Sequence, residues 1–346
     1  MNCHNFSKEP VRLILDTDMG NDIDDALALA MLHAMQSRGE CELLGVISSK
    51  AHELSPVFID LMNTFYGRGT IPVGAVHEGV TPNERTYLGP ICRAPDRFPR
   101  SYPENGYEPS VALLRRLLSR EADGSVTLLM IGFSTNIAQL FDTGADEHSP
   151  LDGRELLARK VGRVVVMAGD FSEEVQRHPT LDNREYNVHC DISASMRFFN
   201  DCPVPLTLCG YEIGLAMLYP CRSILEDYEW TRYHPLAEGY RLYKPMPYDR
   251  PMWDPAAALE AVRPGCEAFT CSPPGWVAVD EQGIMRFHED SAGLHRYLKI
   301  VPEQLKQSVN EIVELCAQPV YTDRQTVGKG IAENSTSATG SACPSL

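Results

Sequence analysis

Short apolar runs alternate along the chain with segments whose apolar residues recur at helical spacing. The runs with the composition of buried strands are Val11–Leu15, Leu43–Ser48, Val126–Ile131, Val161–Met167 and Val204–Leu208. The helical patterns are a stretch that begins near Asp24, then Pro56–Tyr66, Pro109–Ser119, Thr135–Phe141 and Ile192–Asn200. Strands that alternate with helices predict an α/β fold: a mostly parallel central sheet with helices on both faces, in an open doubly wound arrangement.

Two long stretches interrupt this alternation. Residues 76–107 are rich in Pro, Arg, Gly and Tyr, and residues 228–253 are dense in Tyr and Trp. Loops of this length in a compact domain often form lids or binding sites, so we expect both to be irregular binding loops. From Thr322 onward the chain is polar and low in complexity, which predicts disorder. We therefore expect a single domain over residues 8–320 and a disordered tail over residues 321–346.

Composition narrows the class of protein. The chain has 346 residues, of which 43% are hydrophobic, enough for a sizeable core. A formal net charge of −16 argues against nucleic acid and anionic membranes as partners. No apolar stretch approaches the roughly 20 residues of a membrane span. The N-terminus lacks the apolar segment of a secretory signal, and the 11 cysteines form no CxxC pair. We expect a cytoplasmic protein with reduced thiols.

Five aspartates follow the first apolar run within ten residues: Asp16, Asp18, Asp22, Asp24 and Asp25. They lie where a strand ends and a helix begins, at the edge of the sheet where open α/β folds bind ligands. So many carboxylates repel one another unless a cation or protons neutralise them. Oxygen ligands favour calcium or magnesium over zinc. The alternative is a solvated acidic turn in which Asp24 caps the helix.

This cluster resembles the N-terminal signature of the nucleoside hydrolase family of the inosine–uridine-preferring type, Asp-x-Asp-x-Gly followed by Asp-Asp-Ala. The matching residues are Asp16, Asp18, Gly20, Asp24, Asp25 and Ala26. Many members have a shorter spacer, whereas the longer form in this chain, GNDIDD, adds Asp22. The resemblance implies a calcium-dependent hydrolase that cleaves the N-glycosidic bond of ribonucleosides.

Three later segments resemble further motifs of the family, in the family's order. Residues 132–138, GFSTNIA, are similar to the motif whose Thr carbonyl ligates calcium. Residues 185–187, EYN, resemble the motif that binds ribose hydroxyls, and residues 253–255, WDP, resemble the late motif that completes the calcium shell. Each segment alone would fit an ordinary helix start. Together with the aspartate cluster they span nearly the whole predicted domain.

The resemblance implies a metal site and a catalytic base. The calcium ligands would be Asp18, Asp25, Asp254 and the main-chain carbonyl of Thr135, all of them hard oxygen donors. Asp18 would also act as the general base toward the attacking water. Asp16 would support the ligands from behind.

The resemblance also implies a substrate site. Asp24 would bind the 2′-hydroxyl of the ribose and Asp254 the 3′-hydroxyl, while Glu185 and Asn187 would orient the remaining hydroxyls. Trp253 stands where many members have His, as in some purine-preferring members, and it could stack on a purine base. Purine nucleosides are therefore slightly favoured. Family members assemble as homodimers or homotetramers, so we expect one of these states.

Two departures from the family pattern concern the substrate. The family often has Gly-Asn after its second strand, where this chain has SKAH at residues 49–52, so His52 is the candidate for that ribose contact. An Asn that usually precedes the Glu is Pro179 here, and Asn183 is the nearby candidate. A modified or phosphorylated ribonucleoside therefore stays open as the substrate. Basic residues that could serve such an anionic group are His52, His178, Arg177 and Arg184.

The acid that protonates the leaving base is not identified by the sequence. Trp253 is one candidate, and Tyr233, Tyr240 and Tyr243 are others. Two functions from other classes stay open as alternatives. One is a non-catalytic nucleoside- or ribose-binding protein of the same fold. The other is a phosphatase of the haloacid dehalogenase type, which also opens with Asp-x-Asp after its first strand.

Overall fold

The computed structural model describes residues 9–81, 87–101, 106–178 and 184–320. The predicted tail over residues 321–346 and the candidate Asn183 lie outside the described residues. The strands are β1 (Val11–Thr17), β2 (Cys41–Ser48), β3 (Val73–Ala75), β4 (Glu108–Pro109), β5 (Val126–Met130), β6 (Val161–Met167), β7 (Leu206–Cys209), β8 (Leu218–Tyr219), β9 (Arg250–Pro251), β10 (Phe269–Cys271), β11 (Gly275–Val279), β12 (Met285–Glu289) and β13 (Arg296–Ile300).

The helices are α1 (Asp24–Ser37), α2 (Ser55–Phe65), α3 (Leu88–Cys92), α4 (Ser110–Arg120), α5 (Thr135–Phe141), α6 (Gly153–Lys160), α7 (Glu173–Arg177), α8 (Tyr186–Cys190), α9 (Ile192–Asp201), α10 (Tyr211–Ala216), α11 (Cys221–Glu226), α12 (Pro235–Tyr243), α13 (Trp253–Val262) and α14 (Leu305–Cys316). A 3₁₀ turn, Pro302–Gln304, leads into α14. Within the described residues, every helix is too short or too polar to cross a lipid bilayer.

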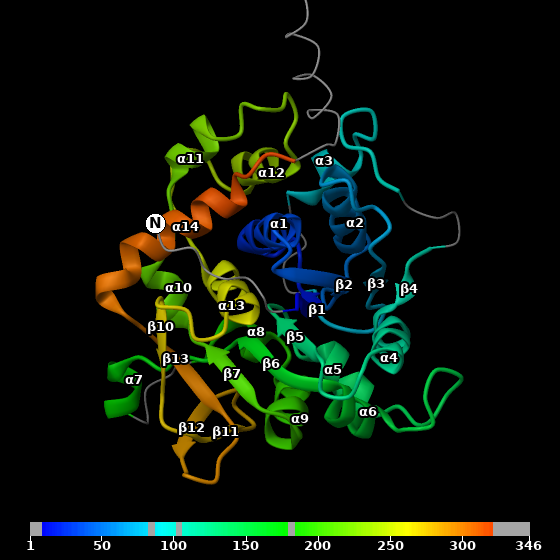
Figure 1. Ribbon diagram of the computed structural model, residues 1–346, viewed down its shortest axis with the longest axis vertical. Helices are drawn as coiled ribbons and strands as arrows, with labels where there is room; N and C mark the ends of the chain where they lie inside the picture. Colours follow the sequence, from blue (N-terminus) through cyan, green and yellow to red (C-terminus); the bar gives the residue numbers. More distant parts are fainter. Residues whose placement is uncertain (1–8, 82–86, 102–105, 179–183, 321–346) are drawn as a thin grey trace, which may run out of the picture.

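The central sheet has nine strands in the order β10-β13-β7-β6-β5-β1-β2-β3-β4 (Figure 1). All neighbouring pairs are parallel except β10 with β13, which is antiparallel. The predicted mostly parallel α/β fold is therefore confirmed. All five predicted strands are present, and the last of them begins two residues later than the apolar run suggested.

Helices cover both faces of the sheet because the central strands are apolar on both sides. In β1, Leu13 and Leu15 pack into one core and Ile14 into the other. The first core is built from α1, α2, α12, α13 and α14, and the second from α4, α5, α6 and α9. Figure 1 shows these two groups of helices on opposite sides of β1, β5 and β6.

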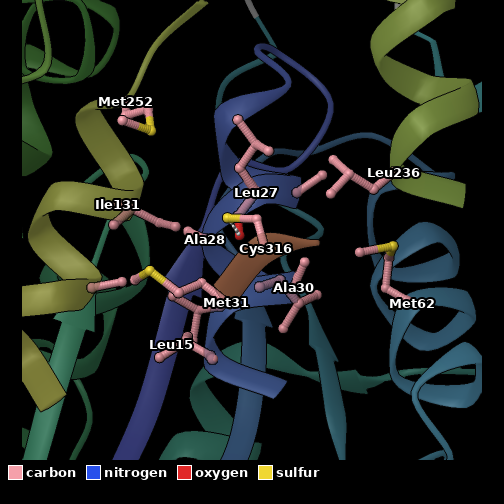
Figure 2. Packing of buried hydrophobic residues seen from close by; sticks show 14 of the residues in the cluster. Leu15, Leu27, Ala28, Ala30, Met31, Met62, Ile131, Leu236, Met252 and Cys316 are labelled. Carbon is pink, nitrogen blue, oxygen red and sulfur yellow. Dashed lines mark hydrogen bonds between the residues drawn. The ribbon is translucent and has the colours of Figure 1, made fainter. Parts of the chain in front are cut away.

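Helix α1 is almost completely enclosed in the first core. Every residue from Asp24 to Met35 is buried, and the helix packs against α13 and α14. Figure 2 shows Leu27, Ala28 and Met31 of α1 among side chains from the sheet and the surrounding helices. A helix that is apolar on all sides must be buried all round, as the run LALAML indicates. This enclosure fixes the N-terminus of α1, which carries two aspartates of the cluster.

The two stretches that we expected to be irregular are partly helical. Residues 76–107 contain α3, and residues 228–253 contain α12 and β9. Helix α12 forms because Pro235 occupies its first position, while Leu236, Ala237 and Tyr240 give it a buried face. The second stretch is therefore a packed part of the wall beside α1 and not a long free loop.

Candidate active site

The carboxyl ends of the parallel strands surround a cavity of about 360 Å³. Seven of the predicted site residues line it, namely Asp18, Asp24, Asp25, Glu185, Asn187, Trp253 and Asp254. They come from the loops after β1, β6 and β9 and from the first turns of α1, α8 and α13. Residues more than 200 positions apart in the sequence therefore meet at one edge of the sheet, where ligands of such folds bind.

Three carboxylates form the centre of this site. One oxygen each from Asp24, Asp25 and Asp254 lies within 4.8 Å of the others, and all three residues are buried. Asp25 and Asp254 have pKa values well above the ordinary range, because burial and the neighbouring charges both disfavour ionisation. The same causes, led by burial, raise the pKa of Asp24 to about 7. The three carboxyl groups therefore cannot all be ionised together at neutral pH unless a cation binds between them.

Two helix N-termini point their partial positive charge at this group, since Asp24 and Asp25 lie in the first turn of α1 and Asp254 in that of α13. Neither helix uses these aspartates as a side-chain cap, because Ile23 and Met252 occupy the cap positions without side-chain hydrogen bonds. The alternative of a solvated turn capped by Asp24 is therefore wrong. Instead, the main-chain N–H of Asp254 donates to Oδ2 of Asp24 over 3.3 Å.

Asp18 lies beside the three-carboxylate group, with its carboxyl within hydrogen-bond reach of Asp25. Nδ2 of Asn21 donates to Oδ2 of Asp18 over 2.6 Å, and Nζ of Lys50 donates to Oδ1 of Asn21. Burial raises the pKa of Asp18 to about 6, although Asn21 and the positive charge of Lys50 oppose the shift. The fully buried Lys50 is thus linked to the carboxylates through one amide.

Asp16 sits behind these residues and does not line the cavity. Nδ2 of Asn136 donates to its Oδ1 over 3.0 Å and also to the main-chain oxygen of Ser48 over 3.1 Å. Asn136 is fully buried and so joins the ends of β1 and β2. Burial raises the pKa of Asp16 well above its ordinary value. Asn136 follows Thr135 in the GFSTNIA motif, and sequence reasoning had assigned it no contact.

Thr135 begins α5 and is buried, but it does not line the cavity. Its hydroxyl donates to Oδ2 of Asp191, which also caps α9 through the main-chain N–H of Ala194. Its carbonyl as a metal ligand stays a prediction.

Glu185 and Asn187 are held by the ends of β5 and β6. The Glu185 carboxylate accepts from the main-chain N–H of Asn187 over 2.9 Å and of Val188 over 3.2 Å, which caps α8. Burial raises the pKa of Glu185 to about 7. Nδ2 of Asn187 lies 3.4 Å from the carbonyl oxygens of Ile131 and Met167. Both side chains are therefore fixed in place before any ligand enters.

The cavity is also lined by Asp22 and Arg250, to which the sequence analysis assigned no role. Asp22 pairs with Arg250: Nε of Arg250 donates to Oδ1 over 2.8 Å, and Nη2 donates to Oδ2. The Arg250 guanidinium lies 5.1 Å from the ring centroid of Trp253 and 5.2 Å from that of Tyr243. Trp253 also stacks on Tyr211, with centroids 5.5 Å apart. Asp22, which had no role, is thus the partner of a cation in the site.

Several other candidates do not reach the cavity. Nδ1 of His52 accepts from the main-chain N–H of Leu54 at the start of α2, and the ring does not line the cavity. Tyr240 is fully buried and donates to the carbonyl of Tyr248, while Tyr233 packs against Phe98. Of the three tyrosines proposed for leaving-group chemistry, Tyr243 alone lines the cavity.

Fold and site together define an α/β protein with a buried acidic centre at the carboxyl edge of its sheet. The chain belongs to the inosine-uridine preferring nucleoside hydrolase family, whose sequence profile matches residues 13–294. This membership removes the phosphatase alternative. Among curated proteins, none matches the chain significantly in sequence.

Solved structures of nucleoside hydrolases share the fold. A plant nucleoside hydrolase has a TM-score of 0.66 and 18% identity, covering 90% of this chain and 100% of that one. The purine-preferring ribonucleoside hydrolase from Gardnerella vaginalis has a TM-score of 0.64 and 19% identity, covering 88% and 99%. The type III effector protein XopQ, solved with adenosine diphosphate ribose, has a TM-score of 0.64 and 14% identity, covering 90% and 94%.

Proposed function

We propose that the protein is a calcium-dependent ribohydrolase that cleaves the N-glycosidic bond of ribonucleosides to ribose and free base, with purine nucleosides slightly favoured. One observation carries the proposal. Three buried carboxylates from two family motifs, Asp24, Asp25 and Asp254, meet beside a cavity. The same cavity is lined by Glu185 and Asn187 of the ribose-binding motif.

The donor set fits calcium. The carboxylates are hard oxygen donors of the kind that calcium prefers. Burial and mutual repulsion raise the pKa values of Asp25 and Asp254, and a bound cation would offset both effects. The ligands that we propose are Asp18, Asp25, Asp254 and the Thr135 carbonyl. Asp24 lies close enough to Asp25 and Asp254 to contact the same ion. When bound, the cation supplies the positive charge that makes a water molecule easier to deprotonate.

The side chains around this centre have separate tasks. Asp18 accepts the proton of the attacking water, and its hydrogen bond from Asn21 fixes which oxygen is available. Asp24 receives the 2′-hydroxyl on the oxygen that does not accept from the main chain of Asp254. Glu185 and Asn187 hold further hydroxyls. Fixing the sugar on several sides stabilises the oxocarbenium-like transition state of glycosyl cleavage.

The preference for purines rests on the aromatic lining of the cavity. Tyr186, Tyr211, Tyr243 and Trp253 all contribute to it. Flat aromatic surfaces suit a nucleobase, and the larger ring system of a purine gains more contact from stacking. A homodimer or homotetramer in the cytoplasm completes the proposal, together with a contact from Asn183 to the sugar; His52, whose ring does not line the cavity, is no longer proposed for that contact.

A second candidate function is nucleoside or ribose binding without turnover. Lys50 favours it, because a buried ammonium linked to Asp18 through Asn21 competes with a metal ion for the same negative charge. The phosphorylated or modified nucleoside is kept as a narrower variant of the enzymatic proposal.

A substrate panel tests both functions. Purine and pyrimidine ribonucleosides, 2′-deoxynucleosides and 5′-monophosphates are incubated with the protein, with calcium or with a chelator, and released sugar is measured. We expect ribose release that the chelator abolishes, that calcium restores and that Asp18→Ala eliminates. Asp142→Ala, a change at an exposed position, serves as the matched control and should be fully active. Tight nucleoside binding in calorimetry with no sugar released over hours would favour the binding protein.

A further inference from the structure

The lining of the cavity includes a cation that is fixed on several sides. Arg250 lies in the short strand β9, and its side chain is only 14% exposed. Asp22 accepts from Nε and Nη2, so the pair is bidentate. The rings of Trp253 and Tyr243 lie against the same guanidinium. Trp253 is itself anchored, since its Nε1 donates to the carbonyl of Tyr211 over 2.8 Å.

This arrangement leaves hydrogen-bond donors of Arg250 available to a ligand. A guanidinium has five N–H donors and no acceptor, and Asp22 occupies two of them. Among the described residues, Nη1 has no hydrogen-bond partner. Because Arg250 lines the cavity, its remaining donors can reach a molecule bound there. The guanidinium keeps its charge at every pH at which a nucleoside is stable.

We infer that Arg250, held by Asp22, donates hydrogen bonds to the nucleobase as it leaves the sugar. The inference rests on the proposed function and supplies the leaving-group interaction that the motifs do not identify. In a nucleoside the base is attached to C1′, next to the carbon that carries the 2′-hydroxyl. The Arg250 guanidinium lies 5.1 Å from the ring centroid of Trp253, the residue proposed to stack on the base, so its remaining donors lie beside the place proposed for the base.

The chemistry balances without a further reactant. The C1′–N bond breaks and its electron pair stays on the base nitrogen, while the water oxygen bonds to C1′ and its proton passes to Asp18. Arg250 keeps its own protons and stabilises the negative charge that grows on the base. The departed base then takes a proton from solvent and becomes neutral. A preorganised donor of this kind is worth about 10²–10³ in kcat.

The competing use of Arg250, recognition of a phosphate or another anionic substituent, fits the geometry less well. Asp22 cancels most of the guanidinium charge and holds two of its donors, so the pair presents a dipole and not a net positive charge. A dipole suits a neutral base whose charge develops only during the reaction.

Two substrates with different leaving groups test the inference on the calcium-loaded protein. Inosine has a poor leaving group, whereas p-nitrophenyl β-D-riboside releases a phenolate that needs no stabilisation. We expect Arg250→Gln to lower kcat for inosine by about 10²–10³ and kcat for the aryl riboside by less than about fivefold. Arg250→Lys keeps the charge without the planar fork and should retain more inosine activity than Arg250→Gln.

Asp22 acts through Arg250, so Asp22→Asn should lower kcat for inosine with little change in KM and leave the aryl riboside unaffected. Arg222→Gln is the matched control, because Arg222 is an exposed arginine paired with Glu226 on α11. It should leave both rates unchanged.

Two results would overturn the inference, and they can be told apart. If the wild-type protein hydrolyses both substrates and Arg250→Gln loses both rates equally, or neither, Arg250 has no leaving-group role while the proposed function stands. If the wild-type protein releases sugar from neither substrate, the proposed function fails and the inference with it. Retained aryl riboside activity in Arg250→Gln would itself show that the variant folds.

Discussion

Replacing one of the three clustered carboxylates by its amide should stabilise the metal-free protein. Oxygens of Asp24, Asp25 and Asp254 lie within 4.8 Å of one another. Two ionised carboxylates at that separation repel by about 3.5 kcal/mol at an effective dielectric of about 20, so Asp254 takes part in about 7 kcal/mol of repulsion. Protonating a carboxyl of ordinary pKa at pH 8 costs about 6 kcal/mol, which is slightly less than this repulsion. The metal-free protein therefore prefers to keep a proton on one of the three carboxyl groups.

Asp254→Asn removes this cost while keeping the shape of the side chain. Among the described residues, the Asp254 carboxylate accepts no hydrogen bond, so little is lost. Allowing for relaxation and sharing of charge, we expect a gain of about 2–4 kcal/mol in the metal-free protein at pH 8, or about 3–6 °C in Tm. Calcium at 100 times its Kd should stabilise the wild-type protein by about 2.7 kcal/mol and so raise its Tm. Calcium should not raise the Tm of the variant.

The assay is thermal unfolding at pH 8 after chelation, with and without added calcium. Asp22→Asn is the matched control, because it removes the same charge from the lining of the same cavity but at a carboxylate that pairs with Arg250. It should not raise the metal-free Tm, and it should keep the calcium effect. A metal-free Tm that falls in Asp254→Asn, with a calcium shift equal to that of the wild type, would refute the reasoning.

Three further outcomes follow from the same contacts. Burial raises the folded-state pKa of Asp18 to about 6 and of Asp24 to about 7, so their contribution to the stability of the metal-free protein is fully present below about pH 4 and is lost as pH rises through 6–7; a difference in urea midpoint between the wild type and Asp24→Asn that is the same at pH 5 and pH 8 would contradict this. Asn136→Ala removes two buried hydrogen bonds, one of them to Asp16, and should cost about 2–4 kcal/mol in urea unfolding, against less than about 0.5 kcal/mol for an exposed substitution. Lys50→Met removes a positive charge near the carboxylates and should tighten calcium binding about tenfold in calorimetry, where an unchanged Kd would show that the ammonium does not compete.

The parts of the fold that a local pattern encodes could be predicted from the sequence. Continuous apolar runs such as those of β1 and β6 show strands buried on both faces, and the carboxylates that follow β1 show where the site lies. Helix α12 was missed although Pro235 marks its start, because a segment dense in tyrosines does not show helical spacing clearly. Strand β11 (Gly275–Val279) alternates between buried and exposed positions, but its exposed residues are Trp276 and Ala278, so its sequence shows no alternation of apolar and polar residues.

Contacts between distant residues could not be predicted. Arg250 lies 228 positions from Asp22, and no local pattern distinguishes it from a surface arginine. The sequence gives no sign that Lys50 is buried, since lysines are mostly exposed and are rarely buried without a partner. Its burial follows from the position of Asn21, which only the folded chain brings near. Motif resemblance located the carboxylates but carried no information about the cations that accompany them.

The longer spacer of the aspartate motif links these two cations to one another. It contributes both Asn21, which accepts from Lys50 and donates to Asp18, and Asp22, which binds Arg250. A buried ammonium without acceptors is costly, and Asn21 supplies an acceptor to Lys50. A buried guanidinium depends in the same way on Asp22. The spacer, Lys50 and Arg250 are therefore coupled in the fold, because neighbouring residues of one spacer hold both cations close to the acidic centre.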